Sequence, residues 1–165
     1  MQKIVKAIDV VLSRFLIALM ATIVLAVTWQ VITRFLMASP SSYTEELARF
    51  LLIWIGILGA AYALRTRAHL GIDLITHKVG ARGRLGIEIL VNSMIILFAL
   101  FVMIIGGTRL VLLTLDLEQT SASMGLMMGY IYLVLPLSGA LMIIYASNAI
   151  YEAVVPPNPS SGGSH

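Results

Sequence analysis

The stretch "SYTEELARFLLIWIGILGAAYAL", residues 42–64, decides the fold because it joins a polar helix start to a long apolar run. From Tyr43 to Leu64 it has 22 residues, about 33 Å at the helical rise, enough to cross a hydrocarbon core about 30 Å thick. Ser42 and Glu45 have the spacing of a capping box, in which both side chains accept bonds from the first backbone N–H groups. Glu45 can also pair with Arg49, four residues on. The stretch therefore predicts a membrane-spanning helix that starts at a water interface.

Four stretches lack Asp, Glu, Lys and Arg: residues 50–64 within this segment, and residues 15–33, 89–108 and 119–151. The chain is 59% hydrophobic and has a mean hydropathy of +0.97, which a soluble domain of this size cannot hide from water. We therefore expect an all-α membrane protein with a single domain, residues 1–155, and four transmembrane helices. Their expected ranges are about 10–36, 43–64, 86–109 and 124–151.

The tail, residues 156–165, has the composition of a flexible linker, and its last residues are typical of an artificial extension. We assign it no function.

The positive charges are distributed unevenly between the two sides of the expected membrane. One side carries eight: Lys3, Lys6, Arg14, Arg65, Arg67, Lys78, Arg82 and Arg84. The other side carries three: Arg34, Arg49 and Arg109. The positive-inside rule then predicts that both termini are cytoplasmic, and that the loops at 35–42 and 109–124 face outward. The asymmetry explains the net charge of +3, which gives no reason to expect a nucleic-acid partner.

The cytoplasmic connection between the second and third spans, "HLGIDLITHKVGARGR" at residues 69–84, mixes apolar and polar side chains at helical spacing. It predicts a short amphipathic helix, about 69–80, lying in the headgroup plane of the phospholipids. The basic turn that follows carries Arg82 and Arg84, and anionic lipid would favour it by about 1 kcal/mol per basic residue. His69 and His77 have no Cys or third His near them, so we expect no metal site.

The middle third of every expected span lacks acidic and basic residues. Ion-coupled carriers normally mark their path with such residues or with broken helices, so this chain is poorly equipped to move a solute alone. It also lacks cysteine, paired carboxylates and a nucleophile motif, and it has no histidine within a span. We therefore expect neither an enzyme nor a cofactor, and no substrate-binding residues.

Two features of the spans affect packing. Small residues four apart occur in the second span, where Gly56 precedes Ala60 and Gly59 precedes Ala63. Such rows let helices approach closely, more often inside one bundle than against a partner, and both uses stay open here. Pro136 lies well inside the fourth span, where the loss of a backbone hydrogen bond predicts a kink.

The segment "EELARFLLIWIGILGAAYALRTRAHLGIDL", residues 45–74, resembles the signature of the small membrane subunit (Q-type) of tripartite ATP-independent periplasmic (TRAP) transporters. A second segment, "YIYLVLPLSGALM" around Pro136, resembles the last span of that family. The resemblance extends from about Ala7 to Tyr151. It departs at "GLMMGYIY", residues 125–132, where the family often has a proline and a tryptophan. The residues that carry it are Glu45, Glu46, Arg49, Trp54, Gly59, Ala60, Ala61, Arg65, His69 and Asp73.

The resemblance implies a sodium-coupled importer of an organic acid, of the sialic acid or C4-dicarboxylate type, in the bacterial inner membrane. A periplasmic binding protein would capture the substrate, a large membrane subunit (M-type) would move it, and this chain would support the large subunit's scaffold. Contacts to these partners are then expected from Glu45, Glu46, Arg49, Trp54, Gly56, Gly59, Ala60 and Ala63. On the cytoplasmic side, Arg65, His69 and Asp73 would pair mutually, hold lipid phosphates or contact a partner.

Two other classes remain open from the residues alone. A self-sufficient four-span carrier or channel would need an ionisable group at membrane depth. A membrane anchor of a respiratory complex would usually carry histidines for haem inside its spans, whereas His69 and His77 lie outside them.

Overall fold

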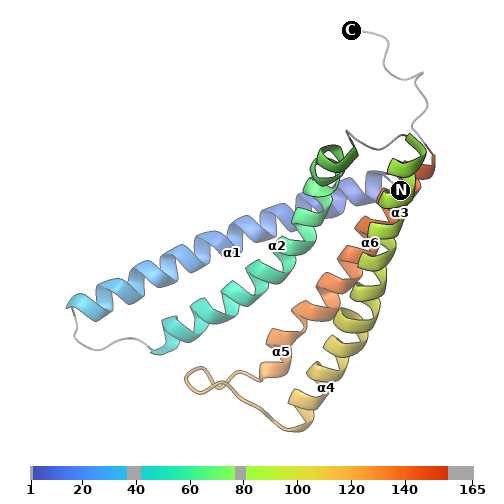
Figure 1. Ribbon diagram of the computed structural model, residues 1–165. Helices are drawn as coiled ribbons and strands as arrows, with labels where there is room; N and C mark the ends of the chain where they lie inside the picture. Colours follow the sequence, from blue (N-terminus) through green and yellow to red (C-terminus); the bar gives the residue numbers. More distant parts are fainter. Residues whose placement is uncertain (1, 37–41, 77–80, 156–165) are drawn as a thin grey trace.

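A computed structural model describes the backbone of residues 2–36, 42–76 and 81–155. Side chains are described over 5–36, 42–66 and 85–155, and at residue 83. Within these ranges the regular structure is helical, apart from one isolated bridge between Thr120 and Met127 (Figure 1). The elements are α1 (Gln2–Leu36), α2 (Ser42–Thr76), α3 (Ala81–Phe98), a π-helix η1 (Ala99–Gly106), α4 (Gly107–Asp116), α5 (Met128–Tyr132) and α6 (Val134–Val154).

Among the described residues, four stretches are long and apolar enough to cross a membrane: Val5–Leu36, Ser42–Thr66, Leu85–Asp116 and Met128–Val154. The expectation of an all-α protein with four long apolar helices is confirmed. The helices run past the expected ranges, and which part of each lies in the membrane stays a prediction. The first begins at Gln2, before the expected start at about 10, and the second continues to Thr76, beyond the expected end at 64. The third span continues through η1 and α4 to Asp116, beyond the expected end at 109. The fourth begins at Met128, after the expected start at 124.

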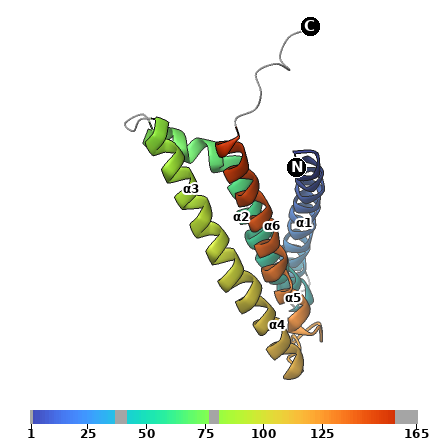
Figure 2. The same ribbon diagram turned by 90° about the vertical axis from the view of Figure 1, so that its right-hand side faces the viewer.

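The helices pair along their lengths: α1 packs on α2, and the continuous unit of α3, η1 and α4 packs on α6. Contacts between α2 and α6 join the two pairs. Figures 1 and 2 show the starts of α1 and α3 and the ends of α2 and α6 at one end of the molecule. We call it the termini end. The opposite end, which carries residues 117–127, is the loop end.

The third span approaches α6 closely because glycines stand at the contact. A Cβ on Gly139 would lie 2.8 Å from Met103 Cβ and 3.1 Å from the carbonyl oxygen of Ala99, both in η1. A Cβ on Gly107 would lie 3.1 Å from Pro136 Cδ. Close backbone approach at small residues is the usual way in which membrane helices gain packing energy. The π-helical turn therefore lies directly against α6.

Helix α5 ends at Tyr132 and α6 begins at Val134, two residues before Pro136. Proline has no backbone N–H to donate, and its ring crowds the carbonyl group one turn earlier. Both effects disrupt the helix just before Pro136, which explains the break between α5 and α6. Leu133 forms the turn between the two helices, and its carbonyl oxygen accepts a bond of 3.3 Å from Leu137 N.

The predicted amphipathic helix at 69–80 is partly described. Helix α2 continues through Thr76, so residues 69–76 are helical and joined directly to the second span. Figure 2 shows the last turns of α2 running across the axis of the preceding part. Residues 77–80, the tail at 156–165, and the side chains of His69, Asp73, Arg82 and Arg84 lie outside the described part. A position in the headgroup plane stays a prediction.

The interior is small, since most apolar side chains face outward. A core cluster forms between α1, α2 and α6, and its buried members are Val5, Leu12, Leu58, Val134 and Tyr145. Large apolar side chains elsewhere are exposed along every span, for example Leu25 at 70% and Leu52 at 62%. In a bilayer such surfaces need no cover, because lipid tails are as apolar as the side chains.

Candidate functional site

At the loop end, the carboxylate of Glu46 holds three consecutive backbone N–H groups. Its Oε1 accepts from Ala122 N at 3.1 Å, and its Oε2 accepts from Ser123 N at 2.9 Å and Met124 N at 3.0 Å. Hydrogen bonds to an ionised acceptor are stronger than neutral ones. We call this arrangement the Glu46 clasp. It ties the first turns of α2 to the loop between the third and fourth spans.

The loop is shaped to receive a carboxylate. The pairing of Ser121 N with Leu126 O and of Met128 N with Gln119 O, both at 2.8 Å, closes it into a narrow hairpin. Gly125 has a φ of 64°, which glycine adopts without steric cost. Successive N–H groups that point to one side form a concave anion site of the kind called a nest. Glu46 occupies that nest from within the same chain.

Glu45 and Arg49 lie beside the clasp and form a separate, exposed ion pair. Arg49 Nη2 is 3.3 Å from Glu45 Oε1, and the two side chains are 66% and 57% exposed. An exposed pair of this kind contributes little to stability, about 0.3 to 0.5 kcal/mol. Both charges therefore remain accessible at the loop end.

Two glycines of the second span, Gly56 and Gly59, face away from the other described helices. No other described part of the chain comes within 4 Å of a Cβ placed on either of them. Gly56 and Ala60 are exposed, and Ala63 is half-buried. We call Gly56, Gly59, Ala60 and Ala63 the small-residue face of α2. Arg49 lies seven residues before Gly56, two turns of the helix, so it continues the same side toward the loop end.

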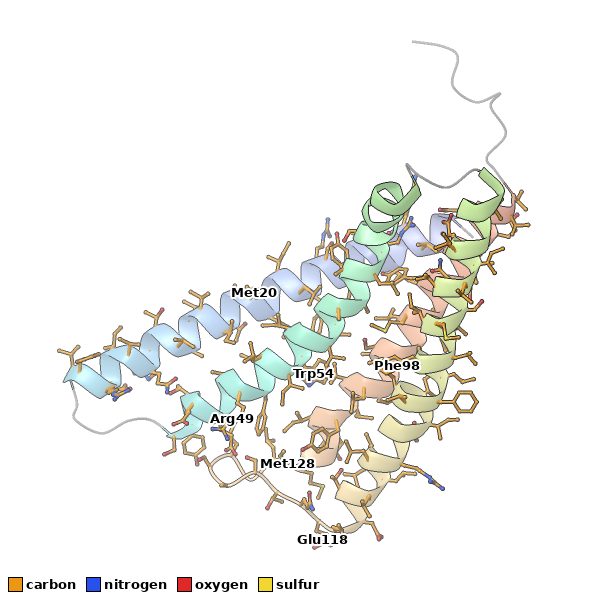
Figure 3. All side chains as sticks on the ribbon, viewed as in Figure 1. Met20, Arg49, Trp54, Phe98, Glu118 and Met128 are labelled. Atoms are coloured by element: carbon orange, nitrogen blue, oxygen red, sulfur yellow. The ribbon has the colours of Figure 1, made fainter. Side chains whose placement is uncertain are left out.

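Trp54 lies between helices of the same chain. Its indole Nε1 donates to the carbonyl oxygen of Ile131 at 3.1 Å. Its ring meets Phe15 edge-on, with centroids 6.2 Å apart and an interplanar angle of 68°. One turn further along α2, the carbonyl oxygen of Ile57 accepts from Ser138 Oγ at 3.0 Å. Trp54 thus joins α1, α2 and α5, whereas Arg49 points toward the loop end (Figure 3).

At the termini end, Arg65 connects three spans. Its Nε lies 3.5 Å from Asp9 Oδ2 on α1, and its Nη1 lies 4.0 Å from Glu152 Oε2 on α6. Each of the three side chains is about one quarter exposed. The sequence had singled out Arg65 but not Asp9 or Glu152. Each of these acids lies near the end of an apolar span. That position was the one feature of the sequence that could have indicated a pairing with Arg65.

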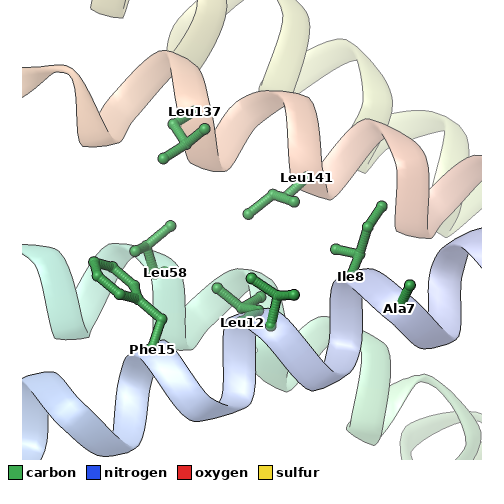
Figure 4. Close-up of a pocket in the computed structure, with 8 residues that line it drawn as sticks. Ala7, Ile8, Leu12, Phe15, Leu58, Leu137 and Leu141 are labelled. Carbon is green, nitrogen blue, oxygen red and sulfur yellow. The ribbon is translucent and has the colours of Figure 1, made fainter.

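The cavity between α1, α2 and α6 is apolar. The cavity in Figure 4, about 370 Å³, lies between α1, α2 and α6 and is lined by Ala7, Ile8, Val11, Leu12, Phe15, Leu58, Leu137 and Leu141. Such a lining suits hydrocarbon and gives no partner to a charged solute. Among the described residues, no three acidic, histidine or cysteine side chains are placed to hold a metal ion.

Comparison with known proteins gives the family. The DctQ component of tripartite ATP-independent periplasmic transporters matches residues 23–155. Sialic acid TRAP transporter small permease protein SiaQ of Vibrio cholerae is 32% identical over 87 residues, 53% of this chain and 49% of that protein. C4-dicarboxylate TRAP transporter small permease protein DctQ of Rhodobacter capsulatus is 31% identical over 100 residues, 61% of this chain and 44% of that protein.

A longer relative carries a similar region within one polypeptide. Isethionate TRAP transporter permease protein DctMQ of Oleidesulfovibrio alaskensis is 31% identical over 136 residues, 79% of this chain and 21% of that protein. The chain thus matches about half or less of the length of these relatives. Because the family match covers most of the chain, the chain belongs to the DctQ family: it is a small permease subunit of a TRAP transporter, a multi-pass membrane protein and not an enzyme.

Proposed function

We propose that this subunit binds no substrate itself and serves as supporting framework for the large membrane subunit. The distribution of polarity carries this proposal. In the described residues, the ion pairs between spans lie at the termini end and the Glu46 clasp lies at the loop end. The cavity between α1, α2 and α6 is lined by apolar side chains alone. Sodium and substrate would then be bound by the partner.

The orientation and the cargo belong to the same proposal. The positive-inside rule places the termini end in the cytoplasm and the loop end in the periplasm of a bacterial inner membrane. The relatives are named for sialic acid, C4-dicarboxylates and isethionate, all organic anions. We infer a binding-protein-dependent, sodium-coupled importer of an organic acid, whose specificity resides in the other subunits.

The small-residue face of α2 is the surface we assign to the large subunit. It is open on the chain's own side, and small residues at helical spacing allow another helix to approach closely. Glu45 and Arg49 are exposed at the periplasmic end of that side, where the large subunit or the docked binding protein would meet them. Glu46 would act indirectly, by holding the loop in place.

The first experiment tests that surface. Gly56→Leu should weaken co-purification of the large subunit at least about tenfold, because a leucine prevents close helix approach. Gly86→Leu is the matched control, since Gly86 also faces open space but lies on α3. If Gly56→Leu recovers as much large subunit as Gly86→Leu, the contact lies elsewhere.

The second experiment tests the division of labour. Proteoliposomes containing the large subunit should take up substrate with a sodium gradient and the binding protein only when this chain is present. Glu46→Ala and Arg49→Ala should lower uptake without changing substrate binding to the soluble protein. Uptake by this chain alone would support a self-sufficient carrier instead, and haem bound to the purified chain would support a respiratory anchor.

A further inference from the structure

A small polar cavity lies between α2, α3 and α6 at the termini end. Its volume is about 10 Å³, and its polar lining consists of Arg65, Glu88, Asn92, Tyr145 and Glu152. Asn92 is fixed on one side by the bond from its Nδ2 to the carbonyl oxygen of Glu88, at 2.8 Å. This cavity differs in kind from the apolar one between α1, α2 and α6.

Tyr145, which lines this cavity, has a side chain that is 2% exposed, and its hydroxyl lies beside the carboxylate of Asp9 without a well-formed hydrogen bond to it. Asn148 Oδ1, on the same helix but outside the lining, also lacks a partner among the described residues. The guanidinium of Arg65 reaches its two carboxylates only at 3.5 and 4.0 Å. Native proteins rarely leave such groups unpaired, because an unsatisfied buried donor or acceptor costs about 1 to 3 kcal/mol.

We propose that the cavity is a binding site for a single water molecule that connects α2, α3 and α6. A volume of about 10 Å³ holds one water and no more, provided that the site offers several polar partners. Water can accept from Arg65 or Tyr145 and donate to Glu88 or Glu152, which pairs groups from all three helices. The lining sets one guanidinium against two carboxylates, and among the described residues no three acidic, histidine or cysteine side chains are placed to hold a metal ion, so the chemistry favours a neutral ligand.

The water would form hydrogen bonds that link neighbouring spans. None of the side-chain hydrogen bonds described at the termini end joins α2 directly to α3, so the water would supply that link. Asp9 extends the network to α1 through Arg65. The site would thus fix all four spans relative to one another at the termini end.

The first test fills the cavity from Ala149, which also lines it. Ala149→Val should displace the water without replacing its hydrogen bonds, and should lower the midpoint of thermal unfolding by at least about 2 °C. Ala149→Ser should leave the midpoint unchanged, since its hydroxyl can replace the water. Ala140→Val, at an exposed position of the same helix, measures the cost of a β-branched residue alone. A midpoint for Ala149→Val equal to or above that of Ala140→Val would show a dry cavity and overturn the proposal.

A second pair of variants probes the tyrosine. Because the hydroxyl also faces Asp9, the change is made in an Asp9→Ala background. There Tyr145→Phe should still lower the midpoint if water completes the bonding of the hydroxyl, and a raised midpoint would contradict the proposal. Tyr151→Phe, at a side chain that is 51% exposed, is the control. Density for the assembled transporter, at a resolution that shows ordered waters elsewhere, should contain a peak in the cavity. Its absence there would refute the site even if every variant folded poorly.

Discussion

The two ends of the molecule are held together by different means. At the loop end, one carboxylate, that of Glu46, takes three backbone N–H groups at 2.9 to 3.1 Å. At the termini end, Arg65 is shared between two carboxylates at 3.5 and 4.0 Å, among polar atoms that need further partners. The first arrangement depends on the shape of a short loop and the second on side-chain charges from several helices. Loss of one member should therefore affect one loop at the first end and several spans at the second.

The largest effect is expected for Arg65→Met. The change leaves Asp9 and Glu152 without their cation in a partly buried site, and such losses destabilise more than the intact pair stabilises. Because each partner is about one quarter exposed, we expect a loss of about 2 to 3 kcal/mol in the free energy of unfolding. Thermal unfolding of the chain in lipid nanodiscs measures it. Arg49→Met, at an exposed pair, should stay within about 0.5 kcal/mol of the original chain. If Arg65→Met and Arg49→Met lower the free energy of unfolding equally, the proposed difference between the two ends is wrong.

Glu46→Gln should have the next largest effect, confined to the loop. The amide keeps one acceptor oxygen and turns an NH2 group toward a backbone donor, so the clasp cannot hold all three N–H groups. We expect the amide protons of Ala122, Ser123 and Met124 to exchange with deuterium about tenfold faster. Hydrogen exchange read by mass spectrometry measures the change. Glu45→Gln should leave those amides protected, and slow exchange in both variants would mean that the loop holds its shape without the carboxylate.

The four spans could be predicted because hydropathy is a local property of the chain. A predominantly apolar run of the right length crosses a bilayer whatever lies elsewhere in the sequence, so the second span could be predicted from Tyr43 to Leu64, with its charges confined to the first two turns. The polar start of that span could also be placed, since the spacing of Glu45 and Arg49 is local.

The contacts between spans could not be predicted in the same way. Glu46 and Ser123 are 77 residues apart, and Arg65 and Asp9 are 56 apart, so no local pattern links them. Pro136 was visible in the sequence, but the π-helical turn facing α6 was not, because it depends on how closely two backbones pack at Gly139. Asp9 was not singled out from the sequence, since it lies just before the expected start of the first span at about residue 10.

Trp54→Phe tests the region between the two ends. Phenylalanine keeps an aromatic ring against Phe15 but removes the bond to the carbonyl oxygen of Ile131. The loss should be about 1 kcal/mol in the free energy of unfolding, the usual net worth of one such bond. Trp29→Phe is the control, because Trp29 is 55% exposed. A loss as large as that of Arg65→Met would show that the middle of the bundle, and not the termini end, is the sensitive region.

The smallest expected effect is the coupling between the two ends. Glu46 and Arg65 lie 19 residues apart on α2, about 28 Å at the helical rise, and changes at separated sites with no shared partner add. The combined variant Glu46→Gln with Arg65→Met should therefore show the Arg65 loss in global unfolding and the Glu46 change in loop exchange, each as in the single variant. If the double variant loses much more or much less unfolding free energy than the two single variants lose together, the two ends are coupled along α2. The framework would then respond as one unit to a partner that binds at either end.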